Sequence, residues 1–515
     1  MRKLFGIVIL CAVAVSAIAV PARRDGMIRT DANGTEKMVF LHGNETFHYM
    51  TDADGNWLDE ETLLPMSAEA KAARENHGKA RVAARRAKQE TGVSRLLAPR
   101  GVIILVSFKD KAFSQTNEDM TQWAMGEKYD YNGATGSIHQ YFYDQSWGQY
   151  DMQIDVVGPV TVSQNYSYYG KNDWQGNDQH PDEMVQEACQ LADKQGIDFS
   201  QYDSDGDGKV DWVVILYAGK GEADGGGSNT IWPHQWELSY TGMDFKLDGK
   251  TIDHYCCLNE IDGQTGKRCG IGTFCHEFSH IMGLPDFYAT VEGATHRTLV
   301  NWDIMDYGPY NNDGNTPPNY SAYERWFMGW MTPRQMTAPE NVTLHVLHES
   351  REAILLCEGD HNLDGLNPNP RTFFLLENRI QQGWDKYLPG SGMMITKIQY
   401  SPTKWINNTV NNNSSSLGVD IIEARKNTNA YTGSAYDLFP KGATNWYGFE
   451  NHWVEEITRD FQTGTITFIY DGGWPEGIEE VNSEERTVKS EKVLRDGRLI
   501  IIREGQKFDI LGNRL

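Results

Sequence analysis

The chain has 515 residues, which is enough for more than one domain. Acidic residues outnumber basic residues 71 to 47, and a net charge of -24 argues against nucleic acid as a partner because phosphates would be repelled. A hydrophobic fraction of 39% with a mean hydropathy of -0.55 predicts globular domains and excludes a polytopic membrane protein.

The N-terminus has the parts of an export signal. Arg2 and Lys3 form a basic start, residues 4–20 are apolar, and the small residues 17–19 form a cleavage site. Residues 1–20 are therefore a predicted signal peptide, after whose removal we expect no stable membrane span. Retention as an anchor is the alternative, but the apolar run is short. The bulky Leu10 before Cys11 argues against a lipoprotein signal.

Residues 66–100 differ in composition from the residues on their C-terminal side. They are rich in Ala, Lys, Arg and Glu, which predicts a helix and linker, whereas the apolar run at 101–108 predicts a strand. Basic residues in an exposed linker invite proteolysis. We therefore expect residues 21–100 to be a propeptide that an activating protease releases near Arg95 or Arg100.

An acidic loop at residues 203–211, DSDGDGKVD, precedes a second predicted strand. Alternating carboxylates on a tight loop with further oxygen donors behind them are typical of a calcium site. The expected ligands are Asp203, Asp205, Asp207, the Lys209 carbonyl and Asp211. Val214 stands where an EF-hand has its last glutamate, so another ligand must complete the shell. An acidic turn without an ion is the alternative. A bound calcium would be structural.

The run HEFSHIMGLPDFY at residues 276–288 predicts a zinc site. His276 and His280 are four apart, so both imidazoles lie on one helix face and can share one ion. Glu277 is the candidate general base for a water molecule at that ion. A surface helix with solvated histidines is the alternative.

The third zinc ligand depends on how the helix ends. Gly283 can adopt a left-handed conformation and turn the chain so that Asp286 presents its carboxylate to the ion. Glu292 and Glu324 are alternatives, on the pattern of proteases that take a glutamate from another helix. Three protein ligands with a fourth position open predict a catalytic site rather than a structural one.

The segment NWDIMDYG at residues 301–308 resembles the Met-turn of the metzincin proteases. The resemblance implies that Met305 lies beneath the metal and that the Tyr307 hydroxyl can approach the metal and a developing oxyanion. On the alternative interpretation, Met305 and Trp302 are ordinary core residues.

Together with the zinc motif, segments from about residue 100 to 470 resemble the immune inhibitor A family of secreted bacterial metallopeptidases, also called M6. The segments are SIHQYFYDQSWGQYDMQIDVVGP (137–159), YSYYG (166–170), DSDGDGKVDWVVILYAG (203–219), SAYERWFMGWMTP (321–333) and FFLLENRIQQGWDKYLPGSG (373–392). The resemblance implies an α+β fold with a mixed sheet and an active-site helix at residues 101–335. It also implies an endopeptidase that acts on proteins and peptides.

The same resemblance extends to HGNETFHYMTDADGNWL at residues 42–58, which is similar to precursors of this family. An acid such as Asp52 or Asp54 could occupy the open metal position before activation. A segment that assists folding without touching the metal is the alternative. Two further functions stay open: an inactive adhesin on a protease scaffold, and a zinc hydrolase of a non-protein substrate.

Six cysteines remain beyond the predicted signal peptide, and an even number in an exported chain permits disulfides. The adjacent Cys256 and Cys257 leave the pairing open. Cys275 precedes His276 directly, but without a Cys/His signature we expect it to be packed or oxidised rather than nucleophilic.

Alternating apolar and polar runs at residues 336–475 predict a β-rich, sandwich-like domain. Residues 476–515 contain two predicted short strands and resemble the C-terminal sorting domain of proteins exported by the type IX route of Gram-negative bacteria. This implies a secreted or cell-surface location and an export machinery as partner. A small hairpin that caps the preceding domain is the alternative.

Overall fold

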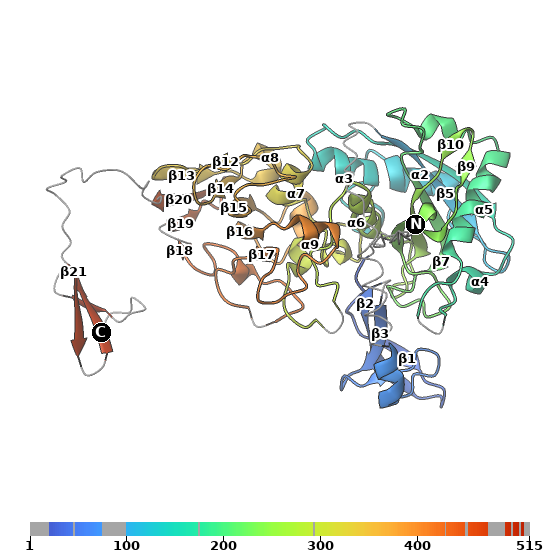
Figure 1. Ribbon diagram of the computed structural model, residues 1–515, viewed down its shortest axis with the longest axis horizontal. Helices are drawn as coiled ribbons and strands as arrows, with labels where there is room; N and C mark the ends of the chain where they lie inside the picture. Colours follow the sequence, from blue (N-terminus) through green and yellow to red (C-terminus); the bar gives the residue numbers. More distant parts are fainter. Residues whose placement is uncertain are drawn as a thin grey trace, which may run out of the picture.

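The computed structural model describes residues 20–44, 47–74, 99–173, 176–291, 294–427, 429–448, 452–471, 490–495, 498–503 and 506–508. The predicted signal peptide up to residue 19 and the expected cleavage position at Arg95 lie outside these residues. Figure 1 shows an α/β unit, a β-rich unit beside it and a small N-terminal sheet, with α6 (Gly272–Ile281) near the middle.

The N-terminal sheet is antiparallel with strand order β1-β2-β3-β4. Its strands are β1 (Met27–Thr30), β2 (Glu36–Asn44), β3 (Phe47–Asp52) and β4 (Trp57–Leu58). One face buries Val39, Leu41 and Met50 in a cluster that also contains Ala223 and Trp232. The sheet is therefore held to the α/β unit by a shared hydrophobic core.

A five-stranded sheet of order β6-β5-β7-β11-β8 forms the base of the α/β unit. Its strands are β5 (Arg100–Ser107), β6 (Gln153–Thr161), β7 (Val213–Lys220), β8 (His234–Glu237) and β11 (His254–Ile261). All neighbours are parallel except the antiparallel edge strand β8. The strand predicted at 101–108 is confirmed, and burial on both faces explains its unbroken apolar run.

Helices and a small hairpin surround this sheet. They are α2 (Asn117–Met125), α3 (Ile138–Gln145), α4 (Tyr166–Gly170), α5 (Pro181–Lys194) and the pair β9 (Lys246–Leu247) and β10 (Lys250–Thr251). Helix α7 (Ala322–Phe327) instead packs against residues 372–379 of the β-rich unit. Helices α2 and α7 begin with capping boxes at Thr116 and Ser321, which satisfy backbone N–H groups that the first turn leaves free.

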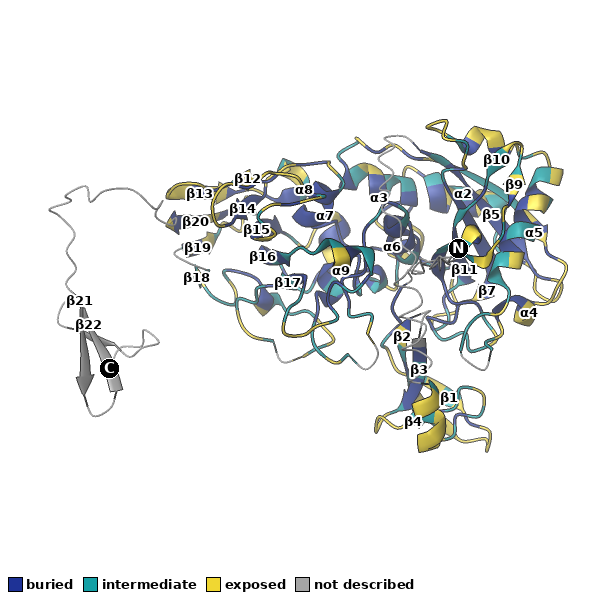
Figure 2. Cartoon of the chain, viewed as in Figure 1, coloured by how far each residue is buried: buried dark blue, intermediate teal, exposed yellow. Residues whose placement is uncertain are grey.

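Helix α6 is buried almost along its whole length, as Figure 2 shows. Phe274 and Phe278 stack with ring centroids 5.6 Å apart, and the ring of Phe278 meets the ring of Trp212 edge-on at 5.1 Å. A fully buried aromatic side chain contributes roughly 1.5 to 3 kcal/mol relative to exposure. The helix is thus fixed by its apolar face while its polar residues turn the other way.

Two sheets make up the β-rich unit. The first has β12 (Arg334–Gln335), β14 (Ile354–Leu356), β15 (Thr372–Arg379), β16 (Gly392–Gln399) and β17 (Val419–Ile421). The second has β13 (Glu340–Leu344), β18 (Trp446–Tyr447), β19 (Trp453–Arg459) and β20 (Ile466–Asp471). Side chains from both sheets share one hydrophobic cluster, so the expected sandwich-like structure and the α+β class are confirmed.

Short helices α8 (Leu347–Ser350) and α9 (Pro402–Ile406) lie in the connections of this unit. Beyond it, β21 (Ser490–Arg495), β22 (Arg498–Arg503) and β23 (Gln506–Phe508) form a small antiparallel sheet, one strand more than predicted. In the part of the chain that the structure describes, no helix has the length and apolar character needed to cross a bilayer.

Candidate metal centre and its cleft

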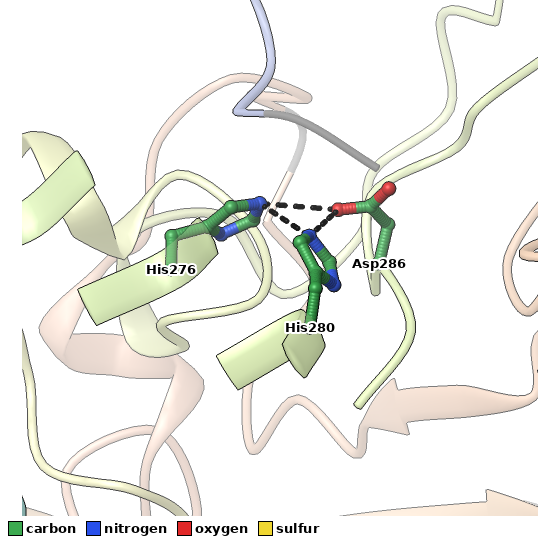
Figure 3. A group of neighbouring side chains, drawn as sticks. All are labelled: His276, His280 and Asp286. Atoms are coloured by element: carbon green, nitrogen blue, oxygen red, sulfur yellow. Dashed lines mark hydrogen bonds and ion pairs between the residues drawn. The ribbon is translucent and has the colours of Figure 1, made fainter. Parts of the chain in front are cut away.

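Three side chains converge beside α6. His276 and His280 come from the helix and Asp286 from the segment after it, and all three are buried (Figure 3). The two Nε2 atoms are 3.0 Å apart, and Asp286 Oδ1 lies 3.2 Å from His276 Nε2 and 3.3 Å from His280 Nε2. The structure therefore brings together the three residues that the sequence nominates.

Hydrogen bonds on the far side of each ring define what this cluster binds. His276 Nδ1 lies 2.7 Å from the Ile304 carbonyl and His280 Nδ1 lies 2.7 Å from the Leu284 carbonyl. Carbonyls accept only, so Nδ1 carries the hydrogen and each Nε2 presents a lone pair. Asp286 Oδ1 has no hydrogen-bond partner within the described residues. Three buried acceptors facing one another require a cation, and two nitrogens with one oxygen fit zinc.

The turn after α6 has the predicted geometry. Gly283 has a φ of 97°, in the left-handed region, and its amide bonds to the His280 carbonyl at 2.9 Å. The Leu284 amide bonds back to Ser279 at 3.0 Å. This ends the helix and reverses the chain so that Asp286 returns to the two histidines.

Asn408, in the β-rich unit, holds Asp286 with both ends of its amide. Its Oδ1 accepts from the Asp286 amide at 2.7 Å, and its Nδ2 donates to Asp286 Oδ2 at 2.6 Å. Oδ1 of Asp286 is thereby aimed at the histidines. The sequence analysis did not identify Asn408, which lies just after α9 in an asparagine-rich stretch, because no local pattern relates it to Asp286.

The turn containing Met305 supports both halves of the site. The Ile304 carbonyl accepts a hydrogen bond from His276 Nδ1. The next carbonyl, that of Met305, accepts a hydrogen bond from the Phe287 amide at 2.7 Å. The Met305 side chain is fully buried. Two adjacent backbone carbonyls therefore set the position of the helix and of the segment that carries Asp286.

Of the alternative third ligands, Glu324 does not join this cluster. Glu324 is buried, but its Oε2 accepts from the Ser321 amide at 2.6 Å within the capping box of α7. Glu292 lies outside the described residues. Asp286 is the carboxylate that the geometry supports.

Glu277 faces the N-terminal segment of the chain. Its Oε1 accepts a hydrogen bond from the Val20 amide at 2.6 Å. Trp232 Nε1 donates to the Val20 carbonyl at 3.3 Å, and the Tyr310 hydroxyl donates to the Pro21 carbonyl at 2.6 Å. Residues 20–24 therefore run through the cleft beside the metal cluster.

Asp52 and Asp54 do not fill this place. Asp52 Oδ1 accepts from the amides of Asp54 and Asn56 at 3.0 and 2.9 Å, in the exposed turn between β3 and β4. The expectation that one of these acids caps the metal is therefore wrong, because Asp52 stabilises its own turn. Sequence reasoning gave no sign that residues 20–24 would lie beside Glu277.

Tyr307 lies under Arg24, whose guanidinium carbon is 3.7 Å from the centroid of the ring. Burial raises the pKa of Tyr307 to about 12, although Arg24 works in the other direction. The phenol is therefore protonated at neutral pH and is able to donate a hydrogen bond.

Three of the five expected calcium ligands in the acidic loop lie close together. Carboxylate oxygens of Asp203, Asp205 and Asp211 lie within 4.8 Å of one another, and Asp203 Oδ1 is buried with no hydrogen-bond partner in the described structure. Asp207 is not in this group, and its Oδ1 accepts from the Lys209 amide at 2.7 Å. The Lys209 carbonyl, which is also an expected ligand, stays a prediction.

The cysteines carry no chemistry in this cleft. All six that the structure describes are free thiols, so no disulfide joins the described residues. Burial raises the pKa of Cys275 well above its ordinary value, which leaves it a protonated core residue.

Comparison with known proteins gives an independent view of this unit. Residues 131–332 match the family model described as "Immune inhibitor A peptidase M6, catalytic domain". Immune inhibitor A of Bacillus thuringiensis subsp. alesti is 28% identical over 221 residues, which cover 37% of this chain and 31% of that protein. The Pre-pro-metalloprotease PrtV of Vibrio cholerae serotype O1 is 27% identical over 244 residues, 41% of this chain and 26% of PrtV. The chain thus spans about a third of one relative and a quarter of the other.

Proposed function

We propose that this chain, whose residues 131–332 belong to the M6 peptidase catalytic domain, is a zinc endopeptidase that hydrolyses peptide bonds of protein substrates. The observation that carries the proposal is the convergence of His276 Nε2, His280 Nε2 and Asp286 Oδ1 with no donor between them. Glu277 follows His276 directly on the same helix.

Bound zinc supplies Lewis acidity, which polarises a carbonyl group and lowers the pKa of a water molecule to about 7. Glu277 takes a proton from the attacking water and returns it to the leaving amine. Its contact with the Val20 nitrogen supports this role, because the nitrogen of the leaving amine must lie within reach of Glu277. Tyr307, protonated at neutral pH, donates a hydrogen bond to the oxyanion.

The described chain is the precursor of this enzyme. Residues 20–24 occupy the cleft beside Glu277, so a substrate cannot reach it until they leave. The propeptide runs from about residue 20 to about residue 100, since cleavage after the small residues 17–19 leaves Val20 on the exported chain. Arg100 is paired with Asp155 at 2.8 Å and is the first residue of β5, so cleavage by an activating protease upstream of Arg100 preserves the sheet.

The acidic loop binds calcium through Asp203, Asp205 and Asp211. Support comes from their mutual approach and from the unpaired Asp203 Oδ1. The ion neutralises three carboxylates beside the start of β7 and so stabilises the loop against local opening.

The protein is exported from a Gram-negative bacterium and acts outside the cell or on its surface. The basic and apolar start of the chain supports a signal peptide, and the small sheet β21–β23 supports a C-terminal sorting segment.

A peptide library tests the proposal. The secreted protein is incubated with the library with and without a zinc chelator, and products are read by mass spectrometry. Chelator-sensitive cleavage of internal peptide bonds is the expected result. Absence of any turnover would favour an inactive binding protein, and chelator-sensitive turnover of esters without peptide cleavage would favour a hydrolase of other substrates.

A further inference from the structure

An acidic pocket of the protease unit holds the side chain of Arg23. Its guanidinium contacts Asp262 through Nη1 at 2.8 Å, Asp313 through Nη2 at 2.8 Å and Asp25 through Nε at 3.0 Å. Arg23 is 6% exposed. Asp25 belongs to the N-terminal segment, whereas Asp262 and Asp313 belong to the protease unit and remain when that segment leaves.

The pocket is built to receive a cation. Asp224 also lines it, with Asn259 donating to its Oδ2 at 3.0 Å, while its Oδ1 is buried and lacks a hydrogen-bond partner in the described part of the chain. Burial is the main cause that raises the pKa of Asp224 to about 7, and the negative charge of Asp262 adds to it. Asp224, Asp262 and Asp313 of the protease unit therefore line one pocket, and the Arg23 guanidinium is paired with two of them.

Asp262 does not need Arg23 to keep its orientation. Its Oδ1 accepts from the amides of Gln264 and Thr265 at 3.0 and 2.6 Å, so Oδ2 points into the pocket. Asp313 lies in a turn closed by the bond from the Gly314 amide to the Asn311 carbonyl at 3.1 Å. The pocket is preorganised by its own backbone and keeps its shape after the propeptide is removed.

The register of residues 20–23 relates this pocket to the cleaved bond. The Val20 amide lies at Glu277, where the leaving amine of a substrate must lie. Val20 thus corresponds to the first residue after the cleaved bond and Arg23 to the fourth. The Trp232, Tyr310 and Ala223 contacts to this segment use its main-chain atoms, which any peptide offers, whereas the acidic pocket contacts a side chain.

We propose that this pocket is a substrate subsite that selects arginine or lysine four residues after the cleaved bond, and that Arg23 fills it in the precursor. The inference rests on the proposed function and names a substrate class for it. Proteins with a basic residue at that spacing from a bond are the favoured substrates.

The test uses the casein-degrading, chelator-sensitive fraction obtained from the secreted full chain. Its kcat/KM is measured on quenched peptides that are cleaved before Val-Pro-Ala-Xaa, with Arg, Lys, Ala or Glu at Xaa. Charge-assisted hydrogen bonds predict at least about a tenfold preference for Arg over Ala, and discrimination against Glu. The peptide Val-Pro-Ala-Arg-Arg should inhibit about tenfold better than Val-Pro-Ala-Ala-Arg for the same reason.

Variants separate the pocket from the rest of the enzyme. Asp262→Asn and Asp313→Asn should bring the Arg-to-Ala ratio of kcat/KM close to one, and a circular dichroism spectrum that matches the parent protein shows that the fold is intact. Asp244→Asn, which removes an exposed carboxylate elsewhere, is the matched control and should keep the preference.

Two results would overturn the inference in different ways. Equal rates for Arg and Ala peptides in a fraction that cleaves them would show that the pocket anchors only the propeptide, with the proposed function intact. Failure to obtain any chelator-sensitive protease from the full chain would remove the proposed function and this subsite with it.

Discussion

His276 donates its Nδ1 hydrogen to the backbone carbonyl of Ile304, 2.7 Å away. The neighbouring carbonyl of Met305 receives the Phe287 amide at 2.7 Å, so one turn holds both the helix and the segment of Asp286. Backbone atoms of the folded chain, rather than the metal, set the distance between the ligands. Several consequences can be measured.

Removing the metal should abolish cleavage without unfolding the chain. The ligands are held by Ile304, Leu284 and Asn408 through hydrogen bonds that contain no metal. Zinc at 100 times its Kd should nevertheless add about 2.7 kcal/mol of stability, because it binds the folded state alone. Calorimetry and circular dichroism with and without chelator check this, and added zinc should restore activity. Loss of all secondary structure on chelation would contradict it.

Glu277→Gln should keep one zinc per chain and lose activity by at least about a hundredfold, because an amide cannot carry the proton of the attacking water. Metal analysis and casein degradation measure the two effects. Glu118→Gln, at an exposed position of α2, is the control and should behave like the parent protein. Full casein degradation by the Glu277 variant would exclude this residue as the base.

Asn408→Gly should weaken zinc binding by about 10- to 100-fold, because the partner that orients Asp286 is lost. Glycine suits this position, where φ is 48°, so the backbone is not strained by the change. Competition with a chromogenic chelator gives the affinity. Asn413→Gly, at an exposed position of the same loop, should leave it unchanged. Equal zinc affinity of both variants would show that the hydrogen bonds from Asn408 to Asp286 do not contribute to zinc binding.

The docked N-terminal segment should loosen as pH rises. Burial alone lowers the pKa of His48, but Glu222 and Glu60 outweigh it and raise the value above 6.5, against a smaller effect of Arg74. A raised folded pKa means that the stabilisation is full below pH 6.5 and is lost as pH rises through the folded value. Burial raises the pKa of Glu222, so the contribution of this carboxyl to stability also falls as pH rises.

Hydrogen exchange of β2 and β3 across that range measures the effect. His48→Gln should reduce the pH dependence and leave the part that comes from Glu222. His42→Gln is a matched control from the neighbouring strand, since burial lowers the pKa of His42 to about 4 and keeps it neutral throughout. An unchanged pH profile in the His48 variant would exclude the pair with Glu222 as the sensor.

Calcium should raise the melting temperature of the chain and of Asp207→Asn, but not of Asp211→Asn. Asp211 belongs to the cluster with Asp203 and Asp205, whereas Asp207 caps the Lys209 amide. Saturation at 100 times Kd corresponds to about 2.7 kcal/mol. Thermal unfolding with calcium or magnesium measures it, and an equal response of both variants would place the ion elsewhere.

The parts of the site that were predictable are those set by neighbours in the chain. The i, i+4 spacing of His276 and His280 places them on one face of any helix, and Gly283 ends α6 with a positive φ as expected. The apolar run of β5 required burial on both faces. In the acidic loop, alternation along the chain predicts which carboxylates face inward, but it does not say which of them approach one another, and Asp207 lies outside the group of Asp203, Asp205 and Asp211.

By itself, the sequence determined the two histidines, the glutamate beside them and the turn after the helix, since helix geometry relates residues a few positions apart. Only the tertiary structure decided that Asn408, 122 residues after Asp286, would aim that carboxylate, and that Val20, 257 residues before Glu277, would cover that glutamate. Such contacts depend on how distant surfaces pack, and no local pattern of residues encodes the path that brings them together.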